Sequence, residues 1–350
     1  MKYDFYTGSY AGSEKESIAL YTLDTETGTL AKKLAVSGVE NPSYLLMHTG
    51  QKVMYSVEEL HPEGRIAVFR MEGELPVYVC SVSTGGADPC HLSMDDEGQY
   101  LFASNYSGGS LAVFRLDDDG LNPVRTDLVQ HTGHSVMKGR QDGAHVHFSR
   151  WINGLLYSCD LGEDRIYIYK LDRTAGKLSE ACEPIRVPEG YGPRHLTWLA
   201  SRPDFLYVIT ELAAKVLVYR HEGAGWMLAG EYDAIEESFE RSELARKIFS
   251  SFGAAIKPSE DGSVIYASIR GTDTIASFLV REDGLLERRA ITPAGGAVPR
   301  DFEVFGSEML CANQNSGTLT LIRYDGGGCA KEQAVTVANG GMPVCIMRVK

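Results

Sequence analysis

A strand pattern that repeats seven times constrains the fold of these 350 residues more than any other feature. Each copy has a strand-length run that ends in polar residues, such as Tyr207–Glu211, and then a second run, such as Lys215–Tyr219. These runs are rich in Tyr, Val and Leu and are too short for helices. The copies recur at roughly 45–60 residues, the spacing of propeller blades. The repeat therefore predicts one all-β domain over residues 1–350, a seven-bladed β-propeller with four-stranded antiparallel blades.

The two ends of the chain each carry part of one blade. Residues 343–348 read as a first strand with nothing after it, whereas residues 4–7 and 17–23 supply later strands. We expect these N- and C-terminal strands to share one blade and close the ring, because closure leaves no edge unpaired.

Two stretches interrupt the repeat. Residues 128–143 are polar and contain glycine, and we expect a loop there. Residues 234–250 have apolar spacing closer to that of a helix than of a strand, which predicts a short helix.

The composition excludes several classes of function. A net charge of −13 argues against nucleic acid and anionic membranes as partners. No apolar run approaches the ~18–20 residues that span a bilayer, and the N-terminus lacks the apolar core of a signal peptide. The seven cysteines are scattered without a CxxC pair. We therefore expect reduced thiols and a cytoplasmic protein, while the oligomeric state stays open.

The stretch over residues 192–220 is the most informative for function. It reads as three short strands, with Pro203 and Asp204 in the first turn. In an antiparallel hairpin, the start of the first strand lies beside the end of the second. Arg194 and His195 should therefore meet Glu211.

The same topology brings further basic residues to this rim. Arginines such as Arg270 and Arg300 bind phosphate or carboxylate groups in a bidentate manner, and the alternative is that they pair with acidic residues as scaffold. His145 and His147 share one face if the strand there is regular. Two histidines without a carboxylate partner are a weak zinc signal, so we expect no metal and no cofactor.

The loop before His145 carries two more cations, Lys138 and Arg140. They are placed to contact a phosphate group over the rim. A solvated surface loop explains them equally well.

Several motifs resemble one known family. They are Arg140-Gln141 with Gly143–His147, Asp160–Ile166, Gly192–Leu196, Glu211-Leu212, Tyr266–Arg270, Pro299–Phe302 and Ala312–Gln314. This set resembles the seven-bladed lactonases typified by propeller-type 6-phosphogluconolactonase, to which fungal muconate-lactonising enzymes are related.

The resemblance implies a carboxylic ester hydrolase without a metal. Its substrate would be a small anionic sugar lactone, with 6-phospho-D-glucono-1,5-lactone of the pentose phosphate pathway as the first choice. The family's proposed active-site set falls on His145, Arg194, Glu211 and Arg270. The substrate-binding residues that we expect around it are Arg300, His147, His195, Arg140 and Lys138.

Some roles and two other functions stay open. Either His145 or Glu211 is the base, and either Arg194 or Arg270 polarises the lactone carbonyl. Glu211 beside arginines would stay ionised and be a weak base, whereas histidine titrates near neutral pH. One alternative function is a relative that lactonises or isomerises a dicarboxylate. The other is a non-catalytic propeller that binds a partner or metabolite.

Overall fold

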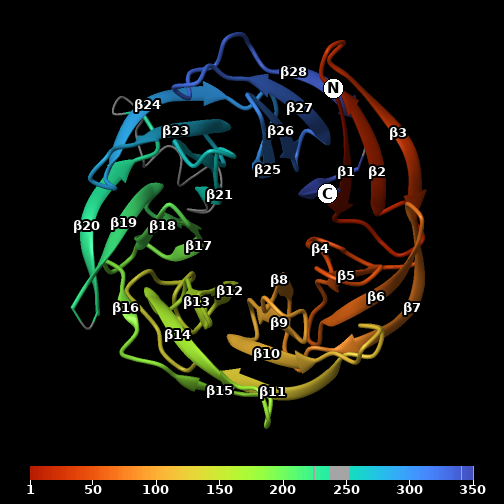
Figure 1. Cartoon of the computed structure of the whole chain (residues 1–350), viewed down its shortest axis with the longest axis vertical. Coiled ribbons are helices and arrows are strands. Elements are labelled where there is room, and N and C mark those ends of the chain that lie inside the picture. Colours follow the sequence, from red (N-terminus) through yellow and green to blue (C-terminus); the bar gives the residue numbers. More distant parts are fainter. Residues whose placement is uncertain (224, 237–251, 340, 350) are drawn as a thin grey trace. The chain divides into compact units, whose positions relative to one another are not determined.

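The computed structural model describes residues 1–223, 225–236, 252–339 and 341–349 (Figure 1). Every element in these ranges is a β-strand, and the strands form seven sheets, as the repeat predicts. The described residues contain no helix of the length and apolarity needed to cross a membrane. From residue 237 on, the predicted helix at 234–250 lies outside the described residues.

The chain divides into two compact units. The first unit comprises Met1–Tyr3, Leu23–Ala31 and Gly190–Arg348, and the second comprises Asp4–Thr22, Lys32–Glu189 and Val349–Lys350.

Three sheets belong wholly to the first unit. They are β17 (Pro193–Leu199), β18 (Arg202–Thr210), β19 (Lys215–Glu222) and β20 (Gly225–Asp233); β21 (Gly253–Pro258), β22 (Val264–Ile269), β23 (Thr274–Val280) and β24 (Leu286–Pro293); and β25 (Pro299–Phe305), β26 (Glu308–Asn313), β27 (Thr318–Arg323) and β28 (Val335–Asn339).

Three other sheets belong wholly to the second unit. They are β4 (Leu45–Met47), β5 (Val53–Glu58), β6 (Arg65–Glu72) and β7 (Leu75–Ser83); β8 (Pro89–Met94), β9 (Tyr100–Asn105), β10 (Ser110–Arg115) and β11 (Val124–Gln130); and β12 (Val146–Ile152), β13 (Leu155–Asp160), β14 (Arg165–Asp172), β15 (Lys177–Glu180) and the short β16 (Ile185–Arg186).

The remaining sheet joins strands from both ends of the chain. Its order is β29 (Pro343–Arg348), β1 (Lys2–Ser9), β2 (Ile18–Asp24) and β3 (Thr29–Val36). The prediction that the terminal strands share one sheet is confirmed.

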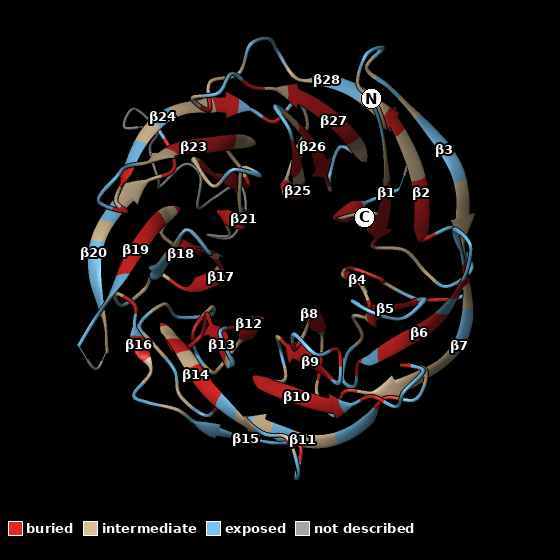
Figure 2. Ribbon diagram, viewed as in Figure 1, coloured by how far each residue is buried: buried red, intermediate tan, exposed pale blue. Residues whose placement is uncertain are grey.

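Burial follows strand position within a sheet (Figure 2). β9 and β10 are almost entirely buried, whereas the outer strand β11 is largely exposed. The inner strands are covered on both faces because neighbouring sheets pack together. One apolar cluster joins Tyr55 and Val68 to Leu101 and Phe114, from two sheets of the second unit. Such burial accounts for the apolar runs in these strands.

In five sheets, the pairing between the start of the first strand and the end of the second strand has a similar irregularity. The pairing of β17 with β18 shifts between Pro193 and His195, so Arg194 forms a β-bulge. We call this the bulge position, and corresponding register shifts place Cys90, His147, Ala254 and Arg300 there.

The residue directly after each second strand also has a constant place. The amide of Glu211 donates to the carbonyl of Gly192 at 2.7 Å. We call this the turn position, and the equivalent amides are those of Tyr106, Leu161, Arg270 and Gln314. Each of the five sheets therefore offers two side chains at one end of its first hairpin.

Two details of the sequence analysis are wrong. The turn between β17 and β18 lies at Ala200-Ser201, not at Pro203 and Asp204. Pro203 lies inside β18, in the segment 203–205 that a register shift leaves without partners in β17, so its missing N–H breaks no bond to that strand. The loop expected at 128–143 begins only at residue 131, because β11 runs to Gln130.

Candidate active site

Arg194, Glu211 and Arg270 form a buried charge cluster in the first unit. Glu211 Oε2 accepts from Arg194 Nε at 3.0 Å and pairs with Arg270 Nη2 at 2.8 Å. The three residues are only 2%, 4% and 7% exposed. Two guanidinium groups thus share one carboxylate oxygen away from solvent, where such pairing offsets the cost of burying charge. The expected contact between Arg194 and Glu211 is present.

The start of β21 holds both arginines in place. Arg194 Nη1 donates to the carbonyl of Ala254 at 2.7 Å, and Arg270 Nη2 donates to that of Gly253 at 2.8 Å. Arg194 Nη1 also lies 3.2 Å from His195 Nε2. Since a guanidinium only donates, His195 Nε2 accepts and its proton is on Nδ1. These bonds fix the direction in which each guanidinium points.

Arg300 occupies the bulge position of another sheet in the first unit. It is half-buried, and its Nη1 donates to Gln314 Oε1 at 3.3 Å. Arg300 therefore contacts the turn-position residue of its own sheet, as Arg194 contacts Glu211.

An aromatic group brings together the two predicted histidines in the second unit. The ring of His145 stacks on Tyr106 at 4.5 Å between centroids, with 15° between the planes. His147, 5% exposed, meets the same tyrosine edge-on at 5.5 Å. His145 precedes β12 and His147 is its bulge residue, so the regular alternation expected for the pair is wrong.

The main chain of His145 is fixed by its neighbours. Its amide donates to Asp160 Oδ1 at 2.8 Å, and its carbonyl accepts from Leu161 at 2.9 Å. Its Nδ1 lies 3.1 Å from the carbonyl of Tyr106. A carbonyl only accepts, so Nδ1 carries the proton. In the neutral ring, Nε2 then carries the lone pair, and it makes no hydrogen bond to the described part of the chain.

Arg140 and Lys138 lie in the loop before His145. Gln141 anchors this loop, because its buried side chain donates to the Leu161 carbonyl at 2.8 Å and accepts from the Met137 amide at 3.1 Å. Arg140 Nη2 donates to the Tyr106 hydroxyl at 3.3 Å. Lys138 is exposed.

One group of side chains in the described ranges has the composition of a metal site. His131, Asp160 and Glu163 place a ligand atom each within 4.8 Å of one another. However, His131 bonds Asp160 Oδ2 at 2.7 Å through Nδ1 and the Tyr169 hydroxyl at 2.8 Å through Nε2. Both ring nitrogens are thus engaged within the protein, and this group includes neither predicted histidine.

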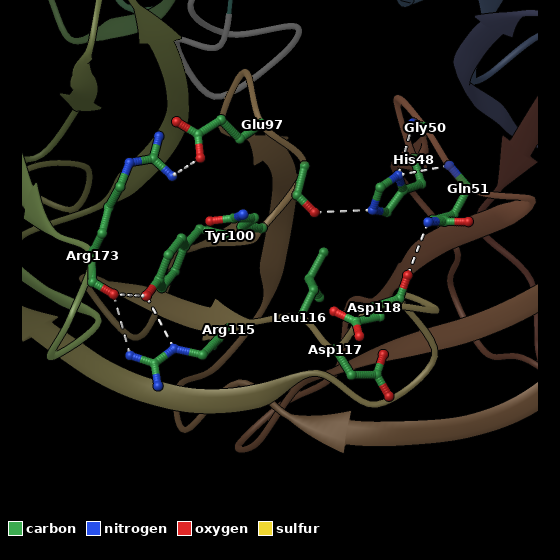
Figure 3. A pocket seen from close by; sticks show the side chains of 12 residues that line it. His48, Gly50, Gln51, Glu97, Tyr100, Arg115, Leu116, Asp117, Asp118 and Arg173 are labelled. Carbon is green, nitrogen blue, oxygen red and sulfur yellow. Dashed lines mark hydrogen bonds and ion pairs between the residues drawn. The ribbon is translucent and has the colours of Figure 1, made fainter.

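A polar pocket of about 490 Å³ is lined by residues that include Tyr100 and His48 (Figure 3). Tyr100 begins β9, so the pocket lies at the opposite end of this strand from Tyr106. Its charged side chains bond to one another and to nearby groups. Arg173 pairs with Asp95 at 2.7 Å, and Arg115 donates to the Tyr100 hydroxyl at 3.0 Å. None of the predicted site residues lines this pocket. We therefore do not assign it to the reaction.

Tyr106 contacts His145, His147 and Arg140, and Gln141 anchors the loop that carries Arg140. The sequence analysis gave neither residue a separate role. The signal for Tyr106 was its place after a second strand, the same place that Glu211 and Arg270 hold. Gln141 was recognised only as part of a motif, since nothing in the sequence shows that its side chain is buried.

Comparison with known proteins supports the fold and the sequence motifs. A family model described as a seven-bladed β-propeller lactonase matches residues 4–348. A 6-phosphogluconolactonase of Bacillus subtilis is 30% identical over 337 residues, 93% of this chain and 92% of that protein. One of Formosa agariphila is 30% identical over 91% of this chain and 92% of that protein.

Solved structures agree with this result. The periplasmic gluconolactonase of Pseudomonas aeruginosa has a TM-score of 0.88 at 27% identity, covering 100% of this chain and 99% of its own. A protein of Lactobacillus plantarum has a TM-score of 0.89 at 27% identity, covering both chains completely. The predicted fold class and family resemblance are thus confirmed, and the chain belongs to the lactonases with a seven-bladed β-propeller fold.

Proposed function

We propose that this chain hydrolyses a sugar lactone, with 6-phospho-D-glucono-1,5-lactone as its substrate and 6-phosphogluconate as its product. The names of the Bacillus and Formosa relatives support this substrate. The observation that carries the proposal is the buried cluster of Arg194, Glu211 and Arg270. Paired guanidinium groups in a desolvated site stabilise negative charge that develops during a reaction. We further propose that the 350 residues act as one domain, in the pentose phosphate pathway of the cytoplasm.

His145 is our choice for the general base. Glu211 Oε2 already contacts two guanidinium groups, which stabilise the ionised carboxylate and make it a poor proton acceptor. His145 Nε2, in contrast, presents its lone pair while Nδ1 is held by a carbonyl. In this assignment Glu211 orients the two arginines.

The reaction needs one water molecule and no redox partner. The water oxygen bonds to the lactone carbonyl carbon C1 while its proton passes to His145 Nε2. A guanidinium group of Arg270 or Arg194 stabilises the resulting oxyanion. The bond between C1 and the ring oxygen then breaks, and His145 returns the proton to that oxygen. The scheme requires no metal.

The remaining predicted residues bind the substrate in this proposal. Arg300, together with Lys138 or Arg140, holds the phosphate group, since arginine matches phosphate oxygens in a bidentate manner. His147 and His195 contact the sugar.

Turnover of freshly made 6-phosphogluconolactone, followed by a coupled assay for 6-phosphogluconate, tests the proposal. We expect His145→Gln to lower kcat about 10²-fold. The matched control is His221→Gln, because His221 is exposed at the end of β19. Treatment with EDTA should leave turnover unchanged.

Three results would count against the proposal. Full turnover by His145→Gln would exclude this histidine as the base. Loss of activity with EDTA, restored by a divalent metal, would overturn the metal-free scheme. No turnover by the wild-type protein would instead favour the non-catalytic propeller.

A further inference from the structure

Tyr106 contacts three of the predicted site residues, although no function is assigned to it. Its ring stacks on His145 and meets the edge of His147, and its hydroxyl accepts from Arg140. Tyr106 holds the turn position of the sheet β8–β11, the place that Glu211 holds in the sheet β17–β20. Glu211 orients arginines from this place, so the corresponding question is what Tyr106 orients.

The Tyr106 main chain determines the tautomer of His145. Its carbonyl accepts from the Gly109 amide at 3.2 Å, which closes the turn, and lies 3.1 Å from His145 Nδ1. A carbonyl oxygen has two lone pairs, so both bonds are satisfied at once. The acceptor in this contact belongs to the backbone, so it remains in place when the Tyr106 side chain is replaced.

The Tyr106 side chain limits how the His145 ring rotates. Asp160 and Leu161 already hold the main chain of His145, which leaves the side-chain torsions as its remaining freedom. The nearly parallel stack at 4.5 Å restricts those torsions and keeps Nδ1 directed at the carbonyl. Without the aromatic face, the ring has room to turn away and lose this bond.

We propose that Tyr106 is a positioning residue that holds the His145 ring in the orientation and tautomer of a general base. This inference rests on the proposed function, in which His145 Nε2 accepts the proton of water. A base that is displaced by about 1 Å loses much of its effect on the rate, because proton transfer needs a short, aligned contact.

The chain itself offers the substitutions for a test. The turn position carries Gln314 in one sheet and Leu161 in another, so this turn accommodates glutamine and leucine. We expect Tyr106→Gln and Tyr106→Leu to lower kcat by about tenfold or more with little change in KM. Tyr106→Phe keeps the stack and should keep kcat. The Tyr106→Phe variant loses the hydroxyl that accepts a hydrogen bond from Arg140. Because Arg140 is a proposed phosphate ligand, the KM of this variant for the phosphorylated lactone should rise a few-fold.

A spectroscopic measurement separates this inference from the proposed function. In protein with ¹⁵N-labelled histidine, the signals that His145→Gln removes belong to His145. The wild type and Tyr106→Phe should show a single tautomer with the proton on Nδ1, and Tyr106→Gln and Tyr106→Leu should show averaged tautomers. Tyr78→Leu, at an exposed tyrosine on β7, is the control that should match the wild type.

These outcomes are distinguishable. If the wild type does not turn over the lactone, the proposed function fails, while the ¹⁵N spectra still decide whether Tyr106 holds the ring. If Tyr106→Gln and Tyr106→Leu keep both the wild-type kcat and the single tautomer, the positioning role of Tyr106 is excluded.

Discussion

The charge cluster of the first unit and the histidine group of the second unit use the same two positions of a sheet for different chemistry. In the first unit, the bulge and turn positions hold Arg194 and Glu211, joined by a buried ion pair. In the second unit, they hold His147 and Tyr106, from neighbouring sheets, joined by ring contacts. The first arrangement depends on charge balance, and the second depends on shape. Substitutions should therefore affect stability most in the first and turnover most in the second.

The largest effect is expected from Glu211→Ala. Removal of the Glu211 carboxylate takes away the negative charge that two buried guanidinium groups share. Breaking a buried ion pair in this way costs about 3–5 kcal/mol of folding free energy. The free energy of unfolding in urea measures this loss. Glu222→Ala is the control, because its pair with Arg220 is exposed and should contribute less than about 0.5 kcal/mol. A loss below about 1 kcal/mol for Glu211→Ala would contradict the charge-balance interpretation.

The second unit should respond most to a change of shape at Gly162. A Cβ atom there would lie 1.9 Å from the Gly143 carbonyl and 2.9 Å from the His145 amide nitrogen. We expect Gly162→Ala to destabilise the protein by about 1–3 kcal/mol and to lower turnover, because the segment that holds His145 must shift. Thermal unfolding and the lactone assay check both effects. Gly326→Ala, in open space, should change neither.

A substitution of Arg300 tests whether this arginine binds the phosphate group, a role different from that proposed for Arg194 and Arg270. If Arg300 holds the phosphate, Arg300→Gln should raise KM for 6-phosphogluconolactone about tenfold and leave KM for unphosphorylated glucono-1,5-lactone unchanged. Steady-state kinetics with the two lactones measure the difference. Equal effects on both substrates would instead assign Arg300 to the lactone ring or to the scaffold.

The smallest effect concerns pH and involves His48, a residue that belongs to neither group. Burial lowers the pKa of His48 from 6.5, although its bond to the Gly98 carbonyl and the charge of Asp95 oppose the shift. The unfolded chain then takes up this proton more readily than the folded chain. Its contribution to stability is therefore complete above pH 6.5 and is lost as the pH falls through the lowered folded-state pKa.

We expect His48→Gln to reduce the loss of stability between about pH 8 and about pH 5 by less than about 1 kcal/mol. Urea unfolding at the two pH values measures this. His134→Gln, at an exposed histidine, is the control substitution. A steeper pH dependence in His48→Gln would contradict the sign of the effect.

The fold was predictable because repeats and apolar runs reflect burial between packed sheets. The contact of Arg194 with Glu211 followed from hairpin geometry alone. The bulges were not predictable, since one extra residue in a strand leaves the apolar pattern almost unchanged while it redirects Arg194 and His147. The role of Tyr106 was hidden for a related reason. A tyrosine after a strand reads as packing, and only the three-dimensional structure shows which ring it faces.

The recurrent bulge has a consequence for how such enzymes diversify. A bulge residue stands outside the regular ladder of backbone pairs, so its replacement leaves the register of its sheet intact. Arginine, histidine and cysteine already occupy this place in different repeats of one polypeptide. A single substitution at this position can therefore change the substrate preference while the sheet keeps its fold.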